Sequence, residues 1–497
     1  MKKVLFSTLT LFLAAVSLPA KVELPAIICD NMVLQQQTDA ALWGTATAGK
    51  TVTICPSWTK EKFQVKADPV TGEWMTRVAT PSAGGPYEIS FSDGDKITVS
   101  NVLIGDVWYC SGQSNMYMRM SGYPSSPVIG AAEAAYTAKA STPIRLFEPP
   151  ERMAGSPELK CGGKWQENTP DVVINSSALA WFFASFLQEV LQVPVGMIVS
   201  SSGGSSIQAW IDRETLSEKF SGEFDLSVLD MREPKLNVHS PCGLYNGMAA
   251  ALAPYTFKGM LWYQGCTNRD YKKPEQYTRL QTEYVAMMRE KFQNPDAGFY
   301  FVQLSPFWCH DPEAFTSGYF YEAQQKTLET IPHSGMVTTT DLGHEANIHP
   351  MDKKTPAERL AYLALQNDYG IKPFDATAPT WKSMRINDKP CSFEPGIKVN
   401  CKSITITFET YNTGMGGSVG PRNGILEGFE IAGEDRVFHK ANAMASWGPD
   451  VTVWSYEVPN PVAVRYCFRN WEPGDLKSNF GIPAAPFRTD DWDDLER

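Results

Sequence analysis

The sequence predicts an α/β protein in which a three-layer α/β/α unit with a parallel sheet lies between two β-rich segments. From residue 104 to 370, strand-like apolar runs alternate with helical ones, which is the pattern of a parallel sheet covered by helices on both faces. On either side, at 21–103 and 371–497, short strand-like runs are separated by turn sequences, which favours antiparallel β structure. A chain of 497 residues has room for several domains.

The first twenty residues, MKKVLFSTLTLFLAAVSLPA, are set apart from these domains. Lys2 and Lys3 precede an apolar run that ends in small residues, which is typical of a secretory signal peptide at 1–20, cut after Ala20. No later segment has eighteen uninterrupted apolar residues, so no membrane span is expected. We therefore expect an exported protein, periplasmic, extracellular or at the cell surface.

The segment 21–103 has the pattern of an N-terminal β-sandwich. Its strand-like runs are separated by the turn sequences TAGK, DPVTG, SAGGP and SDGD, and they cover 41–43, 51–54, 63–65, 74–78, 87–91 and 96–99. Nothing in this segment forms a catalytic cluster.

The central segment, 104–370, carries the elements of the predicted parallel sheet. Strands are expected at 103–110, 194–201, 259–263, 299–304 and 335–339, and helices at 177–192, 274–292 and 355–368. The last helix has Thr355 as its expected N-cap, with Glu358 three residues later. In such sheets, active residues gather at the carboxyl ends of the strands. After residue 371, strand-like runs at 403–408, 425–432, 451–458 and 462–468, interrupted by NTGMGGSVGPRNG, predict a C-terminal β module followed by an acidic tail.

Charge and cysteine usage exclude several function classes. The net charge of −11 argues against a nucleic-acid or anionic-membrane partner. Ten cysteines are widely spaced, without a CxxC or CxxH pair, so a zinc site has little support and no metal is expected. The spacing does not define any disulfide pairing.

A serine follows the first strand of the predicted sheet, in the stretch CSGQSNM. If the strand ends near Cys110 and a helix begins after Asn115, the hydroxyl of Ser114 lies at the carboxyl edge of the sheet. It could be a nucleophile whose own N–H faces a developing oxyanion, or an ordinary helix cap, since serine is preferred there. The stretch is not the GxSxG elbow of α/β-hydrolases.

A serine nucleophile needs a base, and the chain has six histidines. His344 and His349 lie in DLGHEANIHPMDKK, between a predicted strand and a predicted helix, and His310 lies in another loop. His349, which is followed by Pro350, is the better candidate. A loop histidine is more often a local hydrogen bonder, so this residue alone decides nothing.

Two further strand ends carry hydrogen-bond donors. In VSSSGGSSIQAW, Gly203 and Gly204 follow a buried strand, and in LWYQGCTN, Gln264 and Asn268 follow another. Each pair could simply form a turn. Four polar elements, each at a strand end of one predicted sheet, together favour a functional site.

These motifs together resemble a known family. GQSNM at 112–116, GG at 203–204, WYQG with Asn268 at 262–268, and IHP at 348–350 have the order and spacing of the SGNH hydrolase superfamily. More closely, the chain is similar to the sialate O-acetylesterase family. The likeness covers almost the whole chain after residue 20, from NMVLQQ and GDVWYCSGQSNM to RLA and GIPAAPFRTD.

The resemblance implies an SGNH-type hydrolase domain and a serine esterase that removes O-acetyl groups from carbohydrate, typically sialic acid, with no cofactor. By position, Ser114 resembles the nucleophile that forms an acyl-serine, and His349 resembles the base. The other carried-over positions are the oxyanion-hole donors Gly204 and Asn268, and two residues expected to shape the substrate pocket, Gly203 and Gln264.

Two positions depart from the pattern of the family. Ala346 stands where SGNH enzymes usually carry the aspartate three residues before the histidine. The site then works either as a Ser–His dyad, with a backbone carbonyl orienting the ring, or with another carboxylate, such as Asp341 or Glu345. Cys266 stands where the family usually has glutamate after WYQG, which leaves specificity open.

Other functions fit part of the same evidence. An acetylxylan or other plant-glycan deacetylase would use the same motifs, and a glycan-binding protein with a dead hydrolase centre belongs to a different class. A sialate pocket should place a cation against the substrate carboxylate. Arg119, Arg145 and Arg269 lie near the site motifs in sequence and could supply it.

Overall fold

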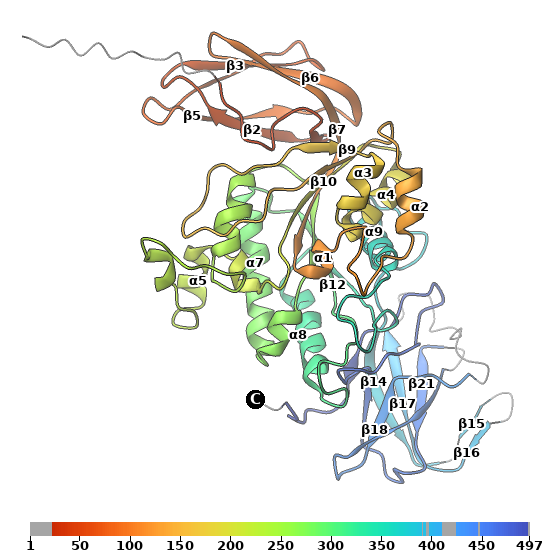
Figure 1. The fold of residues 1–497 in the computed structure, drawn as a ribbon. Coiled ribbons are helices and arrows are strands. Elements are labelled where there is room, and N and C mark those ends of the chain that lie inside the picture. Colours follow the sequence, from red (N-terminus) through yellow and green to blue (C-terminus); the bar gives the residue numbers. More distant parts are fainter. Residues whose placement is uncertain (1–21, 390, 394–396, 410–423, 446–447, 496–497) are drawn as a thin grey trace, which may run out of the picture.

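The computed structural model of the chain describes five stretches: 22–389, 391–393, 397–409, 424–445 and 448–495. The predicted signal peptide at 1–20 lies outside the described residues, as does most of NTGMGGSVGPRNG. N-terminal strands, a central α/β unit and C-terminal strands follow one another along the molecule (Figure 1).

A seven-strand sheet forms the centre of the molecule, in the order β13–β12–β11–β7–β10–β8–β9. Neighbours from β13 to β8 pair in parallel, whereas β9 pairs antiparallel with β8. The predicted α/β class is therefore confirmed, with a mixed sheet in place of a wholly parallel one. The strands are β7 (Lys96–Gly112), β8 (Ile144–Phe147), β9 (Trp165–Glu167), β10 (Val195–Ser201), β11 (Gly259–Tyr263), β12 (Gly298–Val302) and β13 (Ser334–Val337).

Helices cover both faces of this sheet (Figure 1). On one face α4 packs against α9, and on the other α7 packs against α8. Helix α4 is strongly apolar, and Ser177 caps it by accepting a hydrogen bond from Ala180 N–H at 3.2 Å. The four long helices are α4 (Ala178–Leu191), α7 (Pro274–Lys291), α8 (Thr316–Thr330) and α9 (Lys354–Asp368). Further short helices are α2 (Ala131–Thr137), α3 (Pro170–Asn175), α5 (Arg213–Lys219) and the single turns Ile207–Trp210, Ser227–Asp230, Tyr245–Ala249 and Ala250–Leu252.

The start of α9 differs from the prediction. The sequence predicts Thr355 as the N-cap, but the carboxylate of Asp352 accepts from both Thr355 N–H, at 2.9 Å, and the Thr355 hydroxyl, at 2.7 Å. Thr355 is therefore inside the first turn. A carboxylate is favoured at this end of a helix, because it lies against the positive end of the helix dipole.

Strand β7 joins the N-terminal strands to the central sheet. Its first part pairs with β6 (Gly84–Ser92) and β1 (Val33–Gln35), and its second part pairs with β10 and β11. The predicted domain boundary at 103/104 falls inside this one strand. The orientation of the N-terminal unit and that of the sheet are thus set by the same element.

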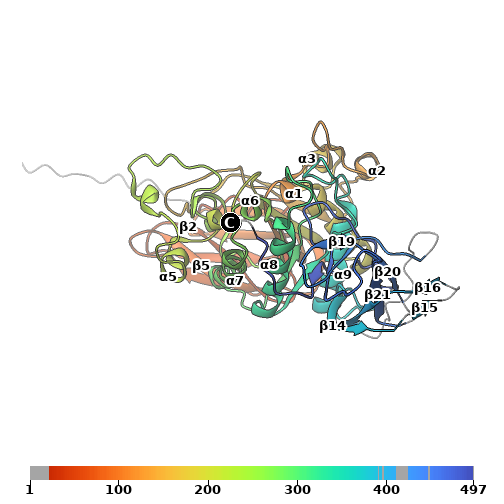
Figure 2. The same cartoon turned by 90° about the horizontal axis from the view of Figure 1, so that it is seen from below.

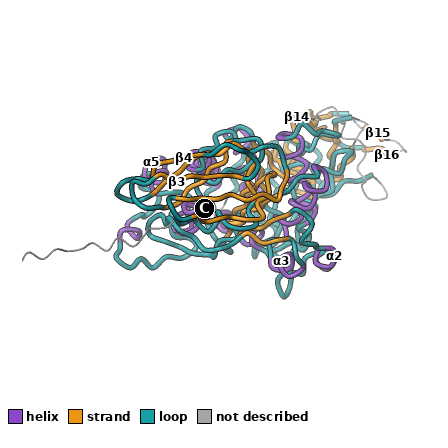
Figure 3. The backbone as a smooth tube through the Cα atoms, turned by 90° about the horizontal axis from the view of Figure 1, so that it is seen from above, coloured by secondary structure: helices purple, strands orange, loops and turns teal. Residues whose placement is uncertain are grey.

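The N-terminal strands form two antiparallel groups. β2 pairs with β5, while β3 pairs with β4 and β6. Trp74 of β5 and Phe91 of β6 lie 5.9 Å apart between ring centroids, so the groups share a core. These strands lie far from β14, β15 and β16 at the other end of the molecule (Figure 3). The remaining bounds are β2 (Asp39–Thr45), β3 (Thr51–Pro56), β4 (Phe63–Lys66) and β5 (Glu73–Ala79).

The C-terminal segment contains two four-stranded antiparallel sheets in the orders β14–β17–β21–β20 and β19–β18–β22–β23. A separate hairpin, β15–β16, completes it. The strands are β14 (Thr380–Asn387), β15 (Cys391–Phe393), β16 (Ile397–Val399), β17 (Ser403–Glu409), β18 (Phe429–Ala432), β19 (Phe438–Lys440), β20 (Asn442–Ala445), β21 (Asp450–Trp454), β22 (Ala463–Tyr466) and β23 (Phe487–Arg488).

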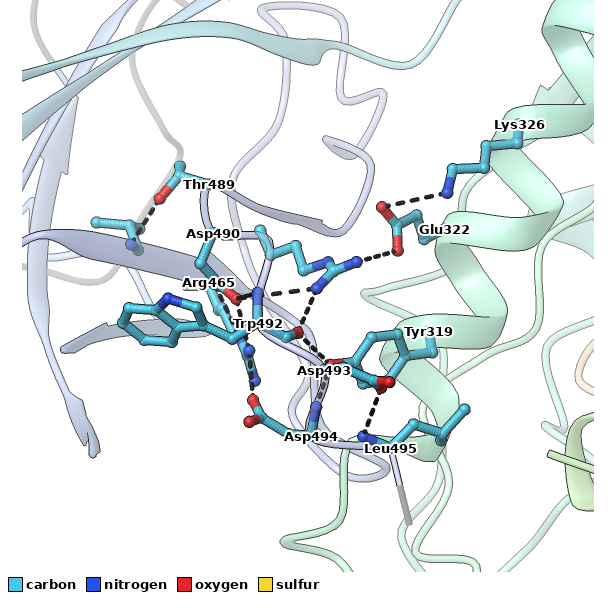
Figure 4. A network of polar contacts seen from close by, with 12 residues as sticks. Tyr319, Glu322, Lys326, Arg465, Thr489, Asp490, Trp492, Asp493, Asp494 and Leu495 are labelled. Carbon is cyan, nitrogen blue, oxygen red and sulfur yellow. Dashed lines mark hydrogen bonds and ion pairs between the residues drawn. The ribbon is translucent and has the colours of Figure 1, made fainter. Parts of the chain in front are cut away.

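The acidic tail ties this module to the central unit (Figure 4). Arg465 on β22 is fully buried and pairs with Asp490 at 2.7 Å and Asp494 at 2.6 Å. On helix α8, Tyr319 donates to the Trp492 carbonyl at 2.7 Å and accepts from Asp494 N–H at 2.8 Å. Two carboxylates of the acidic tail, Asp490 and Asp494, are therefore used in internal ion pairs.

Candidate active site

The carboxyl ends of neighbouring parallel strands bring the predicted site residues to one edge of the sheet. Gly112, the last residue of β7, is the register partner of both Ser201 in β10 and Tyr263 in β11. The three segments after these strands therefore start at the same level. Helix α1 (Ser114–Tyr117) follows β7 and helix α6 (Cys266–Asp270) follows β11 at this edge, and both are labelled in the view from below (Figure 2).

The turn that carries Ser114 is held by the end of β11. Gln113 N–H donates to the Tyr263 carbonyl at 3.0 Å, and the Gln113 side-chain oxygen accepts from Gly265 N–H at 2.9 Å. Gly112 has φ +138°, and a Cβ there would lie 2.2 Å from the Tyr263 oxygen, so only glycine fits. The helix cap is Gln113, so the alternative interpretation of Ser114 as an N-cap serine is wrong.

The loop that carries His349 lies against helix α1. Asn115, the residue after Ser114, donates from Nδ2 to the carbonyl of Ile348 at 3.1 Å. Because Ile348 directly precedes His349, a single hydrogen bond joins the neighbours of the two predicted catalytic residues. The Ser114 hydroxyl and the His349 ring are partly buried and, within the described chain, neither has a hydrogen-bond partner. Catalytic hydrogen bonds are often loose before substrate binds.

The backbone and ring of His349 have further contacts. Its N–H donates to the Asn347 side-chain oxygen at 2.9 Å, and its carbonyl accepts from the Ser126 hydroxyl. The ring of Tyr123 lies 4.8 Å from the imidazole between centroids. These contacts fix the main chain at this position and cover one side of the ring.

The environment of His349 keeps its imidazole neutral. Burial is the larger cause and the nearby Lys353 cation is the second; together they lower its pKa from 6.5 to about 4. A neutral imidazole can accept a proton at neutral pH, as a general base must. A charged ring, in contrast, is disfavoured by the same surroundings.

The glycine pair after β10 offers free backbone donors. Gly203 and Gly204 are exposed, and within the described chain neither N–H has an internal acceptor. Gly204 has φ +71°, which favours glycine, and its carbonyl accepts from the Thr267 hydroxyl at 2.9 Å. The last bond ties this turn to helix α6, so the two predicted donor segments are adjacent.

The orientation of the Asn268 amide is set by its partners. Its oxygen accepts from Ile207 N–H at 3.0 Å and from Gln264 Nε2 at 2.7 Å. Both partners are donors, so the oxygen must face them and the NH₂ must face away. One of its two hydrogens is donated to Gln208 Oε1 at 3.2 Å, and the other has no acceptor among the described residues.

Gln264 holds the Asn268 side chain in this orientation. It has no exposed surface, and Nε2 donates to both Asn268 and the Ser205 carbonyl, the latter at 3.1 Å. We therefore interpret Gln264 as a residue that holds Asn268, where the sequence suggests one that shapes the pocket directly. Gly203 is exposed beside Gly204, and its place in a substrate pocket stays a prediction.

Comparisons with known proteins agree with this geometry. Residues 104–361, more than half of the chain, match the family described as carbohydrate esterase, sialic acid-specific acetylesterase. The chain belongs to this family. It is 30% identical to the human sialate O-acetylesterase, with 71% of this chain and 72% of that protein covered, and 28% identical to the mouse enzyme, with 77% and 80% covered. The structure of a carbohydrate acetylesterase from Xanthomonas citri matches with a TM-score of 0.81 and 29% identity, covering 95% of this chain and all of that one.

Membership of the acetylesterase family makes this protein a carboxylic ester hydrolase. The prediction of the family is thus confirmed, as is the prediction of an enzyme. The roles of the individual site residues and the domain boundaries stay predictions.

Two of the three nearby carboxylates, Asp341 and Asp352, are engaged in other contacts. Asp341 pairs with Arg359 through both oxygens, at 2.9 and 2.7 Å, and with Lys477 at 2.7 Å, which lowers its pKa despite burial. Asp352 accepts from Thr355 in the first turn of α9, and Glu345 is exposed. Ala346 leaves two mechanisms open, a Ser–His dyad or assistance by another carboxylate, and the described contacts favour the dyad.

Of the three arginines suggested as partners of a sialate carboxylate, two already pair with protein carboxylates and the third lies away from the site. Arg119 forms an ion pair with Glu148 and is one-third exposed. Arg145 is wrongly expected near the site, because it lies near the amino end of β8, opposite the carboxyl edge. Arg269 is buried beside the site and pairs with Asp270 at 3.0 Å.

Two site residues are not found by the sequence reasoning. Asn115 lies inside the quoted GQSNM motif, and its position next to Ser114 could have indicated a role. Lys353 follows IHP by three residues, but nothing in the sequence shows that it is buried. Cys266, the other departure from the family, is a buried thiol whose pKa burial raises.

No group of three or more histidine, cysteine or carboxylate side chains in the described stretches could hold a metal ion. Within the same stretches, no helix combines the length and the apolar character needed to cross a membrane.

Proposed function

We propose that this protein is a serine esterase that removes O-acetyl groups from carbohydrate through an acyl-serine, with O-acetylated sialic acid as the favoured substrate. The observation that carries the proposal is the hydrogen bond from Asn115 to Ile348, at 3.1 Å. It brings the segments of Ser114 and His349 together although 235 positions separate them in the chain.

The reaction follows from the groups at this edge. Neutral His349 takes the Ser114 proton while the serine oxygen attacks the acetyl carbonyl. The tetrahedral oxyanion accepts hydrogen bonds from the Ser114 and Gly204 backbone N–H groups and from the free N–H of Asn268. His349 then protonates the departing sugar hydroxyl, and a water activated by the same ring releases acetate. Each oxyanion donor is worth roughly 3–4 kcal/mol of transition-state stabilisation.

Two matched pairs of variants test the serine mechanism. Ser114→Ala should lower kcat on a chromogenic acetyl ester by at least about 10³-fold, while Ser121→Ala, at an exposed serine of the same segment, should leave it unchanged. His349→Ala should lower kcat by about 10²- to 10⁴-fold, and His344→Ala, in the same loop but exposed, should not. Full activity of Ser114→Ala would refute the proposal.

A covalent probe gives an independent readout. A fluorophosphonate should label the wild-type protein once, at Ser114, and should not label Ser114→Ala. Glycan binding with neither labelling nor turnover would instead support the dead, glycan-binding alternative.

The choice of sugar needs a direct comparison. Arg119 and Arg269 already have carboxylate partners, so the described site presents no uncommitted arginine among the three candidates for a sialate carboxylate. The relatives named above favour sialate, and the acetylesterase from Xanthomonas citri is named only for carbohydrate. Rates on O-acetylated sialic acid and on acetylated xylan, measured in parallel, decide between the sialate and plant-glycan readings.

We also propose that the protein is exported. The basic and apolar pattern of 1–20 supports this. An N-terminus beginning at Lys21 in the protein recovered outside the cytoplasm would agree with it.

A further inference from the structure

A buried lysine lies directly behind the two proposed catalytic residues. Lys353 is 1% exposed, and its ammonium donates to Asn115 Oδ1 and to the Pro350 carbonyl, both at 2.7 Å. The ammonium also lies 5.8 Å from the centroid of the Tyr263 ring, at the end of β11. Lysine is almost never fully buried without a charged partner, yet no ion pair involving Lys353 occurs in the described part of the chain. Such a position calls for a reason beyond packing.

The contacts of Lys353 are centred on His349. Three consecutive carbonyls, those of Ile348, His349 and Pro350, each accept a hydrogen bond from a side chain. Asn115 supplies the first and Lys353 the third. The ammonium can only donate, so it obliges the Asn115 oxygen to face it and turns Nδ2 toward Ile348. The lysine therefore donates one of the two hydrogen bonds on either side of His349, to the Pro350 carbonyl, and orients the amide that donates the other, to the Ile348 carbonyl.

We propose that Lys353 is a positioning residue for the esterase reaction: through Asn115 and the Pro350 carbonyl it holds His349 against the Ser114 turn, where no carboxylate of the described residues contacts the His349 ring. This inference rests on the proposed function. The inference adds that His349 is oriented by the Lys353 cation and by hydrogen bonds to the Ile348 and Pro350 carbonyls.

The charges around the ammonium are consistent with this role. Cys266 and Tyr263 face it, and burial raises the pKa of both groups, so they are neutral. Asp352 is the nearby carboxylate, and it accepts from Thr355 N–H in the first turn of α9. The remaining titratable neighbour is His349, whose pKa the ammonium lowers. Burial in turn lowers the pKa of Lys353 to about 7.

The test replaces Lys353 with a residue of similar side-chain volume. Lys353→Met keeps an unbranched apolar stem and removes the charge and the donors. Its matched control is Lys354→Met, because Lys354 is 54% exposed and has one surface ion pair, to Glu358 at 3.8 Å. Activity is expressed per site titrated with the fluorophosphonate, so that an unfolded fraction does not count.

We expect Lys353→Met to lower kcat per titrated site by about 10- to 100-fold, with a smaller change in KM, and Lys354→Met to match the wild type. The acid limb of kcat/KM should move to higher pH in Lys353→Met, because the cation no longer opposes protonation of His349. A purely structural lysine would change the number of titrated sites and the melting temperature, but not kcat per site or the pH profile.

Asn115→Ala provides the second arm and keeps the test open if Lys353→Met does not fold. It removes the acceptor of the lysine and the donor to Ile348 together, so it should lower kcat per site by a similar factor. The double variant should lose little more than either single one, because the two residues act as one unit.

The outcomes separate this inference from the proposed function. Hydrolysis by Ser114→Ala at the wild-type rate would remove the serine mechanism and this inference with it. An inactive Ser114→Ala, together with Lys353→Met and Asn115→Ala variants that keep the wild-type kcat per site and pH profile, would overturn the positioning role alone.

Discussion

Replacing Asn268 with aspartate separates the two tasks of this amide in the site. Its oxygen accepts from Ile207 N–H at 3.0 Å and from Gln264 Nε2 at 2.7 Å, and an aspartate oxygen can accept both. Its NH₂ donates to Gln208 at 3.2 Å and keeps one hydrogen for the oxyanion. Asn268→Asp therefore keeps the two hydrogen bonds that the side-chain oxygen accepts, and it removes both donated ones, the bond to Gln208 and the one proposed for the oxyanion.

The expected magnitude follows from the donor count. Three N–H groups are proposed to face the oxyanion, and the loss of one costs roughly 3–4 kcal/mol, or about 10²- to 10³-fold in kcat. An ionised carboxylate would add repulsion to the developing negative charge. The change should lie in kcat with little effect on KM, because the lost interaction is formed only in the transition state.

The assay is steady-state hydrolysis of an acetyl ester, with kcat expressed per fluorophosphonate-titrated site. Asn237→Asp is the matched control: Asn237 is exposed, and its side-chain oxygen accepts from His239 N–H at 2.8 Å, which aspartate can also do. A kcat for Asn268→Asp within about threefold of the wild type, in a folded protein, would refute the assignment of Asn268 to the oxyanion hole.

Two further predictions concern titration and stability. With a His349 pKa of about 4, the acid limb of kcat/KM should lie near pH 4, so activity persists at pH 5; a limb near 6.5 would contradict the burial argument. Because this pKa is below its unfolded value, His349 should also lower stability as pH falls from about 6.5 to 4, and His349→Ala should lose that part of the pH dependence of the melting temperature. Asp341→Asn should lower the free energy of unfolding by about 3–5 kcal/mol, because it leaves the buried Arg359 without its bidentate partner, while kcat per titrated site stays at the wild-type value. A lower kcat per site would show that this carboxylate assists His349. The Asp341 contribution should be present above its unfolded pKa and should be lost at acid pH, which a denaturation series over pH measures.

The sheet could be predicted because each of its main strands is a short apolar run. The predicted strand 259–263 has the same bounds as β11, and the polar residues after such runs lie at one edge because the strands are parallel. β14 was beyond this reasoning, since Thr380–Asn387 is largely exposed and has no apolar run to indicate a strand. The burial of Lys353 was also beyond it, because its partner Asn115 is 238 positions away in the chain.

Because Ala346 replaces the usual aspartate, a different set of groups must stabilise the transition state. In a Ser–His–Asp site the carboxylate stabilises the imidazolium that forms when serine is deprotonated. Here burial and Lys353 act in the opposite direction and lower the pKa of His349 to about 4. A weaker base makes deprotonation of Ser114 costlier, so a larger share of the barrier must be offset by groups that bind the oxyanion. The fixed orientation of Asn268 and the uncommitted N–H of Gly204 meet that need without reorganisation during the reaction. We therefore expect activity to depend more steeply on the oxyanion donors than on any carboxylate near His349.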